Sequence, residues 1–301
     1  MKLISSNKIY PVEEFDYRLM DTGNLKKLEQ FGPYKFVRPA PQAIWPPQLP
    51  GKDWESANGE FHYHKGKTTG GGEWNFRNPV PKNGWLLRFR DLVFTVHTTP
   101  FGHLGLFPEQ APNWDWISNR VKELNGSKPN VLNMFGYTGA STLAAASRGA
   151  HVTHLDASKT SVTWARKNLE SSGLADCPVR WMVDDVEKFL KREYRRNRKY
   201  DALIMDPPSF GRGPKGEVWN IETQMAKLLT LCRNVLSDSP KFILLTTHSP
   251  GVSALTLKNM MVKFLVAPDL GTFQSGEMSI YDTGSGLHLP NGFYIRYSVN
   301  P

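Results

Sequence analysis

One pentapeptide of this sequence, Asp206-Pro207-Pro208-Ser209-Phe210, combines a carboxylate, a stiff turn and an aromatic ring. Each proline fixes its own backbone and restricts the residue before it, so the carbonyl groups of the turn point in set directions. The Asp206 carboxylate can orient a nucleophilic nitrogen, and the Phe210 ring can stack on a flat base. We therefore predict a catalytic segment here. Its members are Asp206, Pro207, Pro208, Ser209 and Phe210. The alternative is a rigid loop without chemistry.

A glycine-rich basic stretch follows the pentapeptide, Gly211-Arg212-Gly213-Pro214-Lys215-Gly216. Its composition is typical of a mobile loop, which would lie over the site. We predict that Arg212 and Lys215 bind substrate through its phosphate groups, because cations neutralise the backbone of a polyanion. A solvated surface loop with no ligand is the alternative.

Two other carboxylate positions come directly after apolar runs of strand type. Asp156 can accept hydrogen bonds from both ribose hydroxyls of an adenosine, and Asp184 or Asp185 can accept one from the adenine amino group, with Asp185 favoured. The neighbours Ala157 and Ser158 are included in the predicted cofactor site. The alternative role is helix capping, which Asp156, Ser158 and both later aspartates could also perform.

The loop Phe135-Gly136-Tyr137-Thr138-Gly139 is the third predicted part of the cofactor site, with Asn133 just before it. Its small residues let the backbone approach a ligand, and the following helix start favours an anionic group. Only two glycines are present, so the dinucleotide pattern GxGxxG is not met and a nicotinamide-dependent dehydrogenase is disfavoured. The loop fits S-adenosylmethionine (SAM) better, since that molecule offers a carboxylate and no pyrophosphate.

Alternating strand and helix patterns must position these groups. From Asn130 onward we predict strands at 131–134, 151–155, 179–183, 200–205 and 241–247, and helices at 139–149, 158–172, 186–196 and 220–236. One helix and two strands, near Ser279 and at 293–299, complete the chain. Such alternation predicts an α/β fold: a doubly wound, mostly parallel seven-stranded sheet with helices on both faces. Ligands bind at the carboxyl ends of the strands of such sheets.

The first hundred residues have a different composition. They are rich in Pro, Gly and Trp, with strand-like runs at 34–37 and 85–97, so we predict a β-rich extension over residues 1–100. Residues 101–129 are predicted to be a connector that contributes to the cofactor pocket, and residues 130–301 the SAM-binding domain. The tryptophans fit the core of a small β domain, with base stacking as the alternative. The pair His62 and His64 lacks a third ligand at useful spacing, so no metal site is predicted.

Composition narrows the class of protein. The net charge of +9 favours a polyanion partner, RNA first, although many proteins of this type are mildly basic. The two cysteines, Cys177 and Cys232, form no CxxC pair, which favours a reducing cytoplasm without disulfides. No apolar run approaches membrane-spanning length, and the N-terminus lacks the apolar core of a signal peptide. The oligomeric state is not indicated.

Taken together, these segments resemble the class I SAM-dependent methyltransferases, and more closely the large-subunit ribosomal RNA methyltransferases that act on cytosine C5 and guanine N7. The resemblance covers about residues 100–300. It rests on Val131–Gly139, Leu155-Asp156, Asp184-Asp185-Val186, the Asp206–Phe210 segment and Gly105-Leu106-Phe107-Pro108-Glu109-Gln110. It implies SAM as the cofactor and adds Gln110 to the residues that hold it.

Departures from that family pattern bear on the substrate. Ala111 stands where the family has an arginine, so that part of the pocket differs. In Thr246–Gly251, Ser249 stands near the position of the nucleophilic cysteine of cytosine-C5 enzymes, and a serine hydroxyl needs an activating base. The resemblance therefore implies methylation of a base nitrogen of RNA, with ribosomal RNA favoured. Protein or small-molecule methylation, and a catalytically silent RNA-binding protein, stay open as alternatives.

Overall fold

A computed structural model describes residues 8–67, 70–212, 216 and 218–299 of the chain. The described chain divides into two compact units, a larger one of residues 110–278 and 291–299 and a smaller one of residues 8–109 and 279–290. Each unit is described by itself below. Among the described helices, none has both the length and the apolar character needed to span a membrane.

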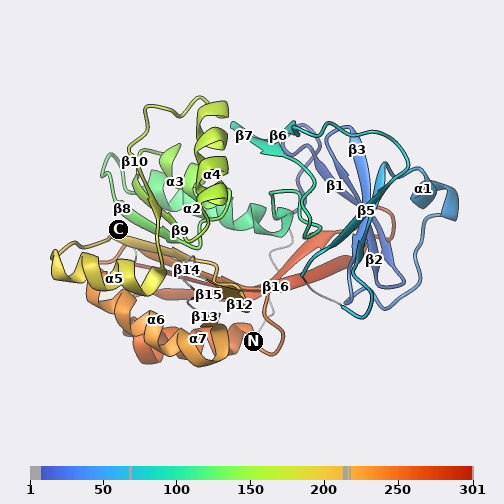
Figure 1. Ribbon diagram of the computed structural model, residues 1–301. Helices are drawn as coiled ribbons and strands as arrows, with labels where there is room; N and C mark the ends of the chain where they lie inside the picture. The colour runs from blue at the N-terminus through green and yellow to red at the C-terminus, as the bar shows by residue number, and fades with distance from the viewer. Residues whose placement is uncertain (1–7, 68–69, 213–215, 217, 300–301) are drawn as a thin grey trace. The chain divides into compact units, whose positions relative to one another are not determined.

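The larger unit is built on a seven-stranded sheet with the strand order β10-β9-β8-β11-β14-β16-β15 (Figure 1). Its first five strands are mutually parallel, and β16 runs antiparallel to β14. The predicted doubly wound, mostly parallel sheet is thereby confirmed. The strands are β8 (Asn130–Met134), β9 (His151–Asp156), β10 (Val179–Val183), β11 (Ala202–Met205), β14 (Phe242–Thr247), β15 (Thr272–Tyr281) and β16 (His288–Ser298).

Six helices cover the two faces of this sheet, with α2, α3 and α4 on one side and α5, α6 and α7 on the other (Figure 1). Their bounds are α2 (Ala111–Glu123), α3 (Ala140–Ala146), α4 (Lys159–Ser171), α5 (Val186–Arg195), α6 (Ile221–Val235) and α7 (Ala254–Phe264). Because both faces are covered, the central strands are buried along their whole length: every residue of β11 and β14 is buried. The helices bury one stripe each, as Met225, Leu229 and Cys232 of α6 do.

The order of the strands places a ligand site. The chain proceeds from β8 outward through β9 to β10, then returns to pair β11 on the other side of β8. In sheets of this topology the loops after two such strands leave in opposite directions, and ligands bind between them at the carboxyl ends of the strands. The loop Phe135–Gly139 and the segment that begins at Asp206 follow these two strands.

The smaller unit is rich in β-structure, as predicted. Its five-stranded sheet has the order β1 (Tyr17–Gly23), β2 (Lys26–Phe31), β3 (Tyr34–Pro39), β4 (Gly59–Tyr63) and β5 (Gly72–Phe76), and a short helix α1 (Gly51–Glu55) precedes β4. The predicted strand-like run 85–97 is a hairpin of β6 (Trp85–Phe89) and β7 (Leu92–Val96), because Arg90 turns the chain with φ 51°. The Trp85 ring stacks on Phe36, a fully buried residue, with 5.7 Å between centroids.

One prediction about the loop after the pentapeptide needs correction. The structure pairs β12 (Phe210–Arg212) with β13 (Val218–Asn220) in a small antiparallel ladder, so the stretch predicted to be a loop begins as a strand. In the ladder, the backbone N–H and C=O groups of the two short strands find partners in each other, a pairing that the glycine-rich composition does not indicate. Residues 213–215, including Lys215, lie outside the described residues.

Candidate functional site

The loop after β8 has an unusual backbone. Phe135 and Tyr137 adopt positive φ angles of 57° and 48°, a region that costs non-glycine residues about 1–3 kcal/mol each. A Cβ atom on Gly136 would lie 2.5 Å from the His154 ring, so only glycine fits there. Gly139, at φ 90°, precedes α3. Strain of this kind persists where the surrounding structure enforces it, and it is concentrated at ligand sites.

Asp156, at the end of β9, fixes this loop. Its carboxylate accepts hydrogen bonds from the backbone N–H groups of Tyr137 (2.9 Å) and Ser158 (2.8 Å). Burial raises the pKa of the Asp156 carboxyl, and these two hydrogen bonds act in the opposite direction. Ser158 caps α4 by accepting from the N–H of Ser161, and Ala157 between them is half-buried. Ser158 therefore takes the capping role that the sequence allowed for either residue, and ribose binding by Asp156 stays a prediction.

A buried polar chain supports the loop from within the sheet. Asn133 Nδ2 donates to Thr142 Oγ1 (2.8 Å), and Thr142 Oγ1 lies 2.9 Å from His154 Nδ1. Burial lowers the pKa of His154 to about 3, so its ring is neutral. The Thr138 carbonyl accepts from Asn168 Nδ2 (2.9 Å). Asn133 and Thr138, both predicted to bind the cofactor, are buried and hold the backbone around the loop.

The two aspartates after β10 have structural partners. Asp185 caps α5 by accepting from the N–H of Lys188 (3.0 Å). Asp184 accepts from the N–H of Asp185 and forms an ion pair with Arg192, whose Nη1 lies 2.6 Å from Asp184 Oδ2. The capping alternative is therefore realised for Asp185, and the adenine contact stays a prediction.

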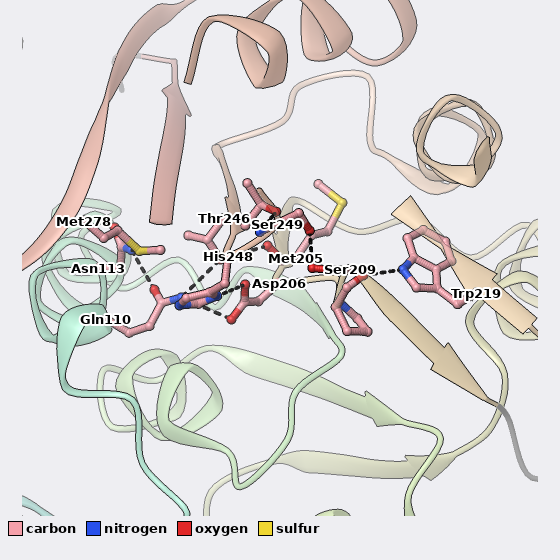
Figure 2. A network of polar contacts seen from close by, with 12 residues as sticks. Gln110, Asn113, Met205, Asp206, Ser209, Trp219, Thr246, His248, Ser249 and Met278 are labelled. Carbon is pink, nitrogen blue, oxygen red and sulfur yellow. Dashed lines mark hydrogen bonds and ion pairs between the residues drawn. The ribbon is translucent and has the colours of Figure 1, made fainter. Parts of the chain in front are cut away.

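At the ends of β11 and β14, a network of side chains converges on Asp206 (Figure 2). Gln110 Nε2 donates to Asp206 Oδ2 (3.1 Å) and to Thr246 Oγ1 (3.2 Å). Asn113 Nδ2 donates to Gln110 Oε1 (2.7 Å), and Arg296 donates twice to Asn113 Oδ1 (2.7 and 3.0 Å). The structure thus brings Gln110, predicted to hold the cofactor, to the predicted catalytic carboxylate.

The second oxygen of Asp206 faces a histidine. His248 Nδ1 lies 3.6 Å from Asp206 Oδ1, too long for a hydrogen bond. That oxygen is buried, and it has no hydrogen-bond partner among the described residues. Burial acts to raise the pKa of Asp206, but its interaction with His248 and hydrogen bonds from Thr246 and Gln110 hold it below its usual value. The carboxylate is therefore anionic and only half satisfied.

The rest of the pentapeptide is anchored in place. Trp219 Nε1 donates to the Pro208 carbonyl (2.6 Å), and the Ser209 and Ser249 hydroxyls lie 2.7 Å apart (Figure 2). Pro207 is buried, whereas Phe210 leaves 55% of its surface exposed. A fixed turn with an exposed ring next to an anionic carboxylate can orient a flat acceptor that carries a nitrogen. Of the predicted phosphate ligands, only the backbone of Arg212 is described, so both stay predictions.

Three residues of this network were not identified from the sequence. His248 lies in the segment Thr246–Gly251 beside Ser249. It follows directly after a buried strand that pairs with β11, and this position indicates a place near Asp206. Asn113 and Arg296 carry no such signal, because they lie 183 residues apart and meet only in the folded chain.

Solved structures of other proteins share this fold. The SAM-dependent methyltransferase from Agrobacterium tumefaciens superposes with a TM-score of 0.87 at 38% identity, over 94% of this chain and 90% of that protein. A structure from Streptococcus mutans shares the fold with a TM-score of 0.70 at 17% identity, over 94% of this chain and 75% of that one. Residues 111–229 match the family described as Conserved hypothetical protein 95.

Curated relatives match over shorter regions. Ribosomal RNA large subunit methyltransferase K of Neisseria meningitidis is 35% identical over 138 residues, 45% of this chain and 38% of that protein. Methyltransferase I of Aeromonas salmonicida is 30% identical over 208 residues, 65% of this chain and 48% of that protein. Methyltransferase K/L of Shewanella frigidimarina is 28% identical over 152 residues, 50% of this chain and 20% of that protein. The matched regions thus span between a fifth and about half of these relatives.

The similarity to the Agrobacterium protein extends over nearly the whole of both chains. This chain belongs to the SAM-dependent methyltransferases.

Proposed function

We propose that this chain binds SAM at the carboxyl ends of β8, β9 and β10 and transfers its methyl group to a nitrogen of an RNA base, in the cytoplasm. Ribosomal RNA is the favoured substrate. The names of the curated relatives support it, as does the excess of 37 Lys and Arg over 28 Asp and Glu.

The residues present fit the cofactor. The strained loop Phe135–Gly139 and the Asp156 carboxylate form a fixed backbone surface with an anionic group beside it, which suits an adenosine with a cationic sulfur. SAM supplies an already activated methyl group. The work left to the protein is placement, and correct placement of two reactants supplies up to roughly 7–11 kcal/mol of the barrier.

One observation carries the assignment of the acceptor side: a buried oxygen of Asp206 without a hydrogen-bond donor among the described residues, held beside a rigid Pro-Pro turn. A buried anionic oxygen without a donor costs folding free energy, so its retention indicates a functional role in which a donor approaches it when substrate binds. The exposed Phe210 ring offers a stacking surface for the acceptor base.

Methylation of cytosine C5 is disfavoured because no thiolate is at hand. Ser249 is engaged with the Ser209 hydroxyl, which is no base that could activate it. Burial raises the pKa of both cysteine thiols, and Cys232 packs under the sheet against Met134 and Met205. Cys177 lies beside the carbonyl of Ala146, at the end of α3. Nitrogen is therefore the favoured acceptor.

The test is in two parts. The first measures SAM affinity by calorimetry for the wild type and for Asp156→Ala, where loss of the carboxylate that accepts from both ribose hydroxyls should weaken binding by about 100-fold or more. The second incubates the protein with methyl-labelled SAM and ribosomal RNA from cells that lack the gene. Label in a methylated base nitrogen supports the proposal. Label only in protein contradicts the RNA substrate. Unaltered SAM affinity of Asp156→Ala contradicts the role of Asp156 in cofactor binding.

A further inference from the structure

We propose that His248 is a further catalytic residue, which accepts the proton that the acceptor nitrogen loses on methylation. The acceptor is then a nitrogen that carries hydrogen, such as an exocyclic amino group. This inference rests on the proposed function and narrows its substrate class.

The placement of His248 is the first support. It follows directly after β14, whose residues pair in parallel register with β11, so the ends of the two strands bring His248 and Asp206 together. Nδ1 of His248 lies 3.6 Å from Asp206 Oδ1 (Figure 2). Distances of this kind between catalytic groups are often long without substrate and shorten when it binds.

The carboxylate gives the imidazole a defined orientation. Because Asp206 Oδ1 is anionic and lacks a hydrogen-bond donor, it favours the tautomer of His248 with the proton on Nδ1. The lone pair of the neutral ring is then on Nε2. A carboxylate that fixes one imidazole nitrogen so that the other accepts a proton is a recurrent arrangement in enzymes.

Asp206 itself is a poor base. Its pKa is held below the usual value despite burial, because His248, Thr246 and Gln110 stabilise the anion. Histidine is the side-chain type best suited to accept a proton near neutral pH. The two residues therefore divide the work: Asp206 orients, and His248 takes the proton.

A relay of side chains keeps Asp206 in position for this role. Gln110 holds its other oxygen, and Asn113 holds Gln110. Asn113 is in turn held by the Arg296 guanidinium, whose Nη2 also donates to the Pro112 carbonyl. Because Gln110 and Asn113 are buried, the orientation of the carboxylate is set by the fold.

The proposed methyl transfer conserves atoms and charge. The lone pair of the acceptor nitrogen attacks the methyl carbon, the bond from carbon to sulfur breaks, and its electron pair stays on sulfur as a neutral thioether. The methylated nitrogen becomes cationic and gives its proton to Nε2 of His248, which later releases it to water. A ring nitrogen without hydrogen, such as guanine N7, has no proton to give and would not need this base.

The experiment compares His248→Ala with the wild type in single-turnover methylation of ribosomal RNA from cells that lack the gene. Methyl transfer should slow by about 100- to 1,000-fold, the usual contribution of a general base. SAM affinity should stay unchanged, and added imidazole should restore part of the rate. His248→Asn, which keeps a polar side chain of similar size, serves if the alanine variant unfolds. The control is His151→Ala. This histidine is exposed and begins β9, at the end of that strand away from Asp156.

The outcomes separate two failures. A wild-type protein that labels ribosomal RNA, with His248 variants equally fast, overturns the inference alone. Labelling that yields 7-methylguanosine also overturns it, because that product needs no base. A slow alanine variant that imidazole does not rescue reduces His248 to a structural residue and overturns the catalytic role. A wild-type protein that labels no RNA overturns the proposed function and this inference with it.

Discussion

Two clusters of charged side chains, one in each unit, differ in whether their hydrogen-bonding capacity is used up. In the smaller unit, Glu29 on β2 accepts from Tyr17, Arg38 and Lys27, and both of its oxygens are paired. In the larger unit, Asp206 has one oxygen held by Gln110 and one buried oxygen without a hydrogen-bond donor among the described residues.

The first cluster is a closed network. Glu29 is fully buried, and Arg38 and Lys27 are nearly so. Burial acts to raise the pKa of Glu29, but the two cations offset this and lower it to about 2. Arg38 also donates to the Gly102 carbonyl (3.0 Å). Nothing in this network calls for a ligand, so we interpret it as a structural link between strands of one sheet.

Structural and functional buried charges differ in whether their hydrogen-bonding capacity is satisfied within the fold. A satisfied buried charge contributes to the fold, and its loss leaves its partners unpaired. An unsatisfied one lowers stability unless a ligand completes it, so its presence points to function. Substitutions of Glu29, Asp206 and Asp185 test that distinction.

Glu29→Gln should have the largest effect on stability. It leaves Arg38 and Lys27 buried beside a neutral amide, and removal of one partner of a buried pair costs about 3–5 kcal/mol. The measurement is the free energy of unfolding in urea. Glu55→Gln, an exposed position in α1, should change it by less than about 0.5 kcal/mol.

The pH dependence provides a second measurement on the same variant. Because the pKa of Glu29 falls from 4.5 to about 2 on folding, its stabilisation is present above about pH 4.5 and is lost as pH falls towards 2. The difference in stability between wild type and variant should shrink by about 3 kcal/mol over that range. A difference that does not depend on pH would show that the pKa of Glu29 is the same in the folded and the unfolded protein.

Asp206→Asn should separate function from stability in the other cluster. The variant keeps an acceptor for Gln110 but loses the anionic oxygen beside His248, so methyl transfer should slow by about 100- to 1,000-fold. The unfolding free energy should change by less than about 1 kcal/mol, because the lost oxygen accepts no hydrogen bond. Asp238→Asn, at an exposed position, is the control for the charge change. A large loss of stability in Asp206→Asn would place Asp206 with Glu29 as a structural charge.

Asp185 should show the smallest effect, and two substitutions separate its two roles. Asp185→Ala removes the cap of α5 and should cost about 1 kcal/mol of stability, whereas Asp185→Ser keeps a good capping residue. If Asp185 also contacts adenine, both variants should bind SAM about tenfold more weakly. If Asp185→Ser binds SAM with wild-type affinity, Asp185 acts only as a helix cap.

Much of the larger unit was predictable because local patterns and global fold agree there. Short continuous apolar runs such as Ala202–Met205 are typical of strands buried on both faces, and their alternation with helical patterns predicts a parallel sheet. Most of the strands of the smaller unit were missed, since its five-stranded sheet is interrupted by prolines, glycines and partly exposed strands such as β5. The division of the chain at residues 100 and 129 stays a prediction.

By itself, the sequence determined the fold class, the order of polar groups at the strand ends and the stiff turn at Asp206, because each depends on residues close together in the chain. Only the tertiary structure decided which of these groups meet. It made Asp185 the cap of α5, paired Asp184 with Arg192, tied Asp156 to the loop before α3, and brought Gln110 and His248 to opposite oxygens of Asp206. The reason is physical: hydrogen-bond partners from distant segments are selected by strand order and register, which no local pattern encodes.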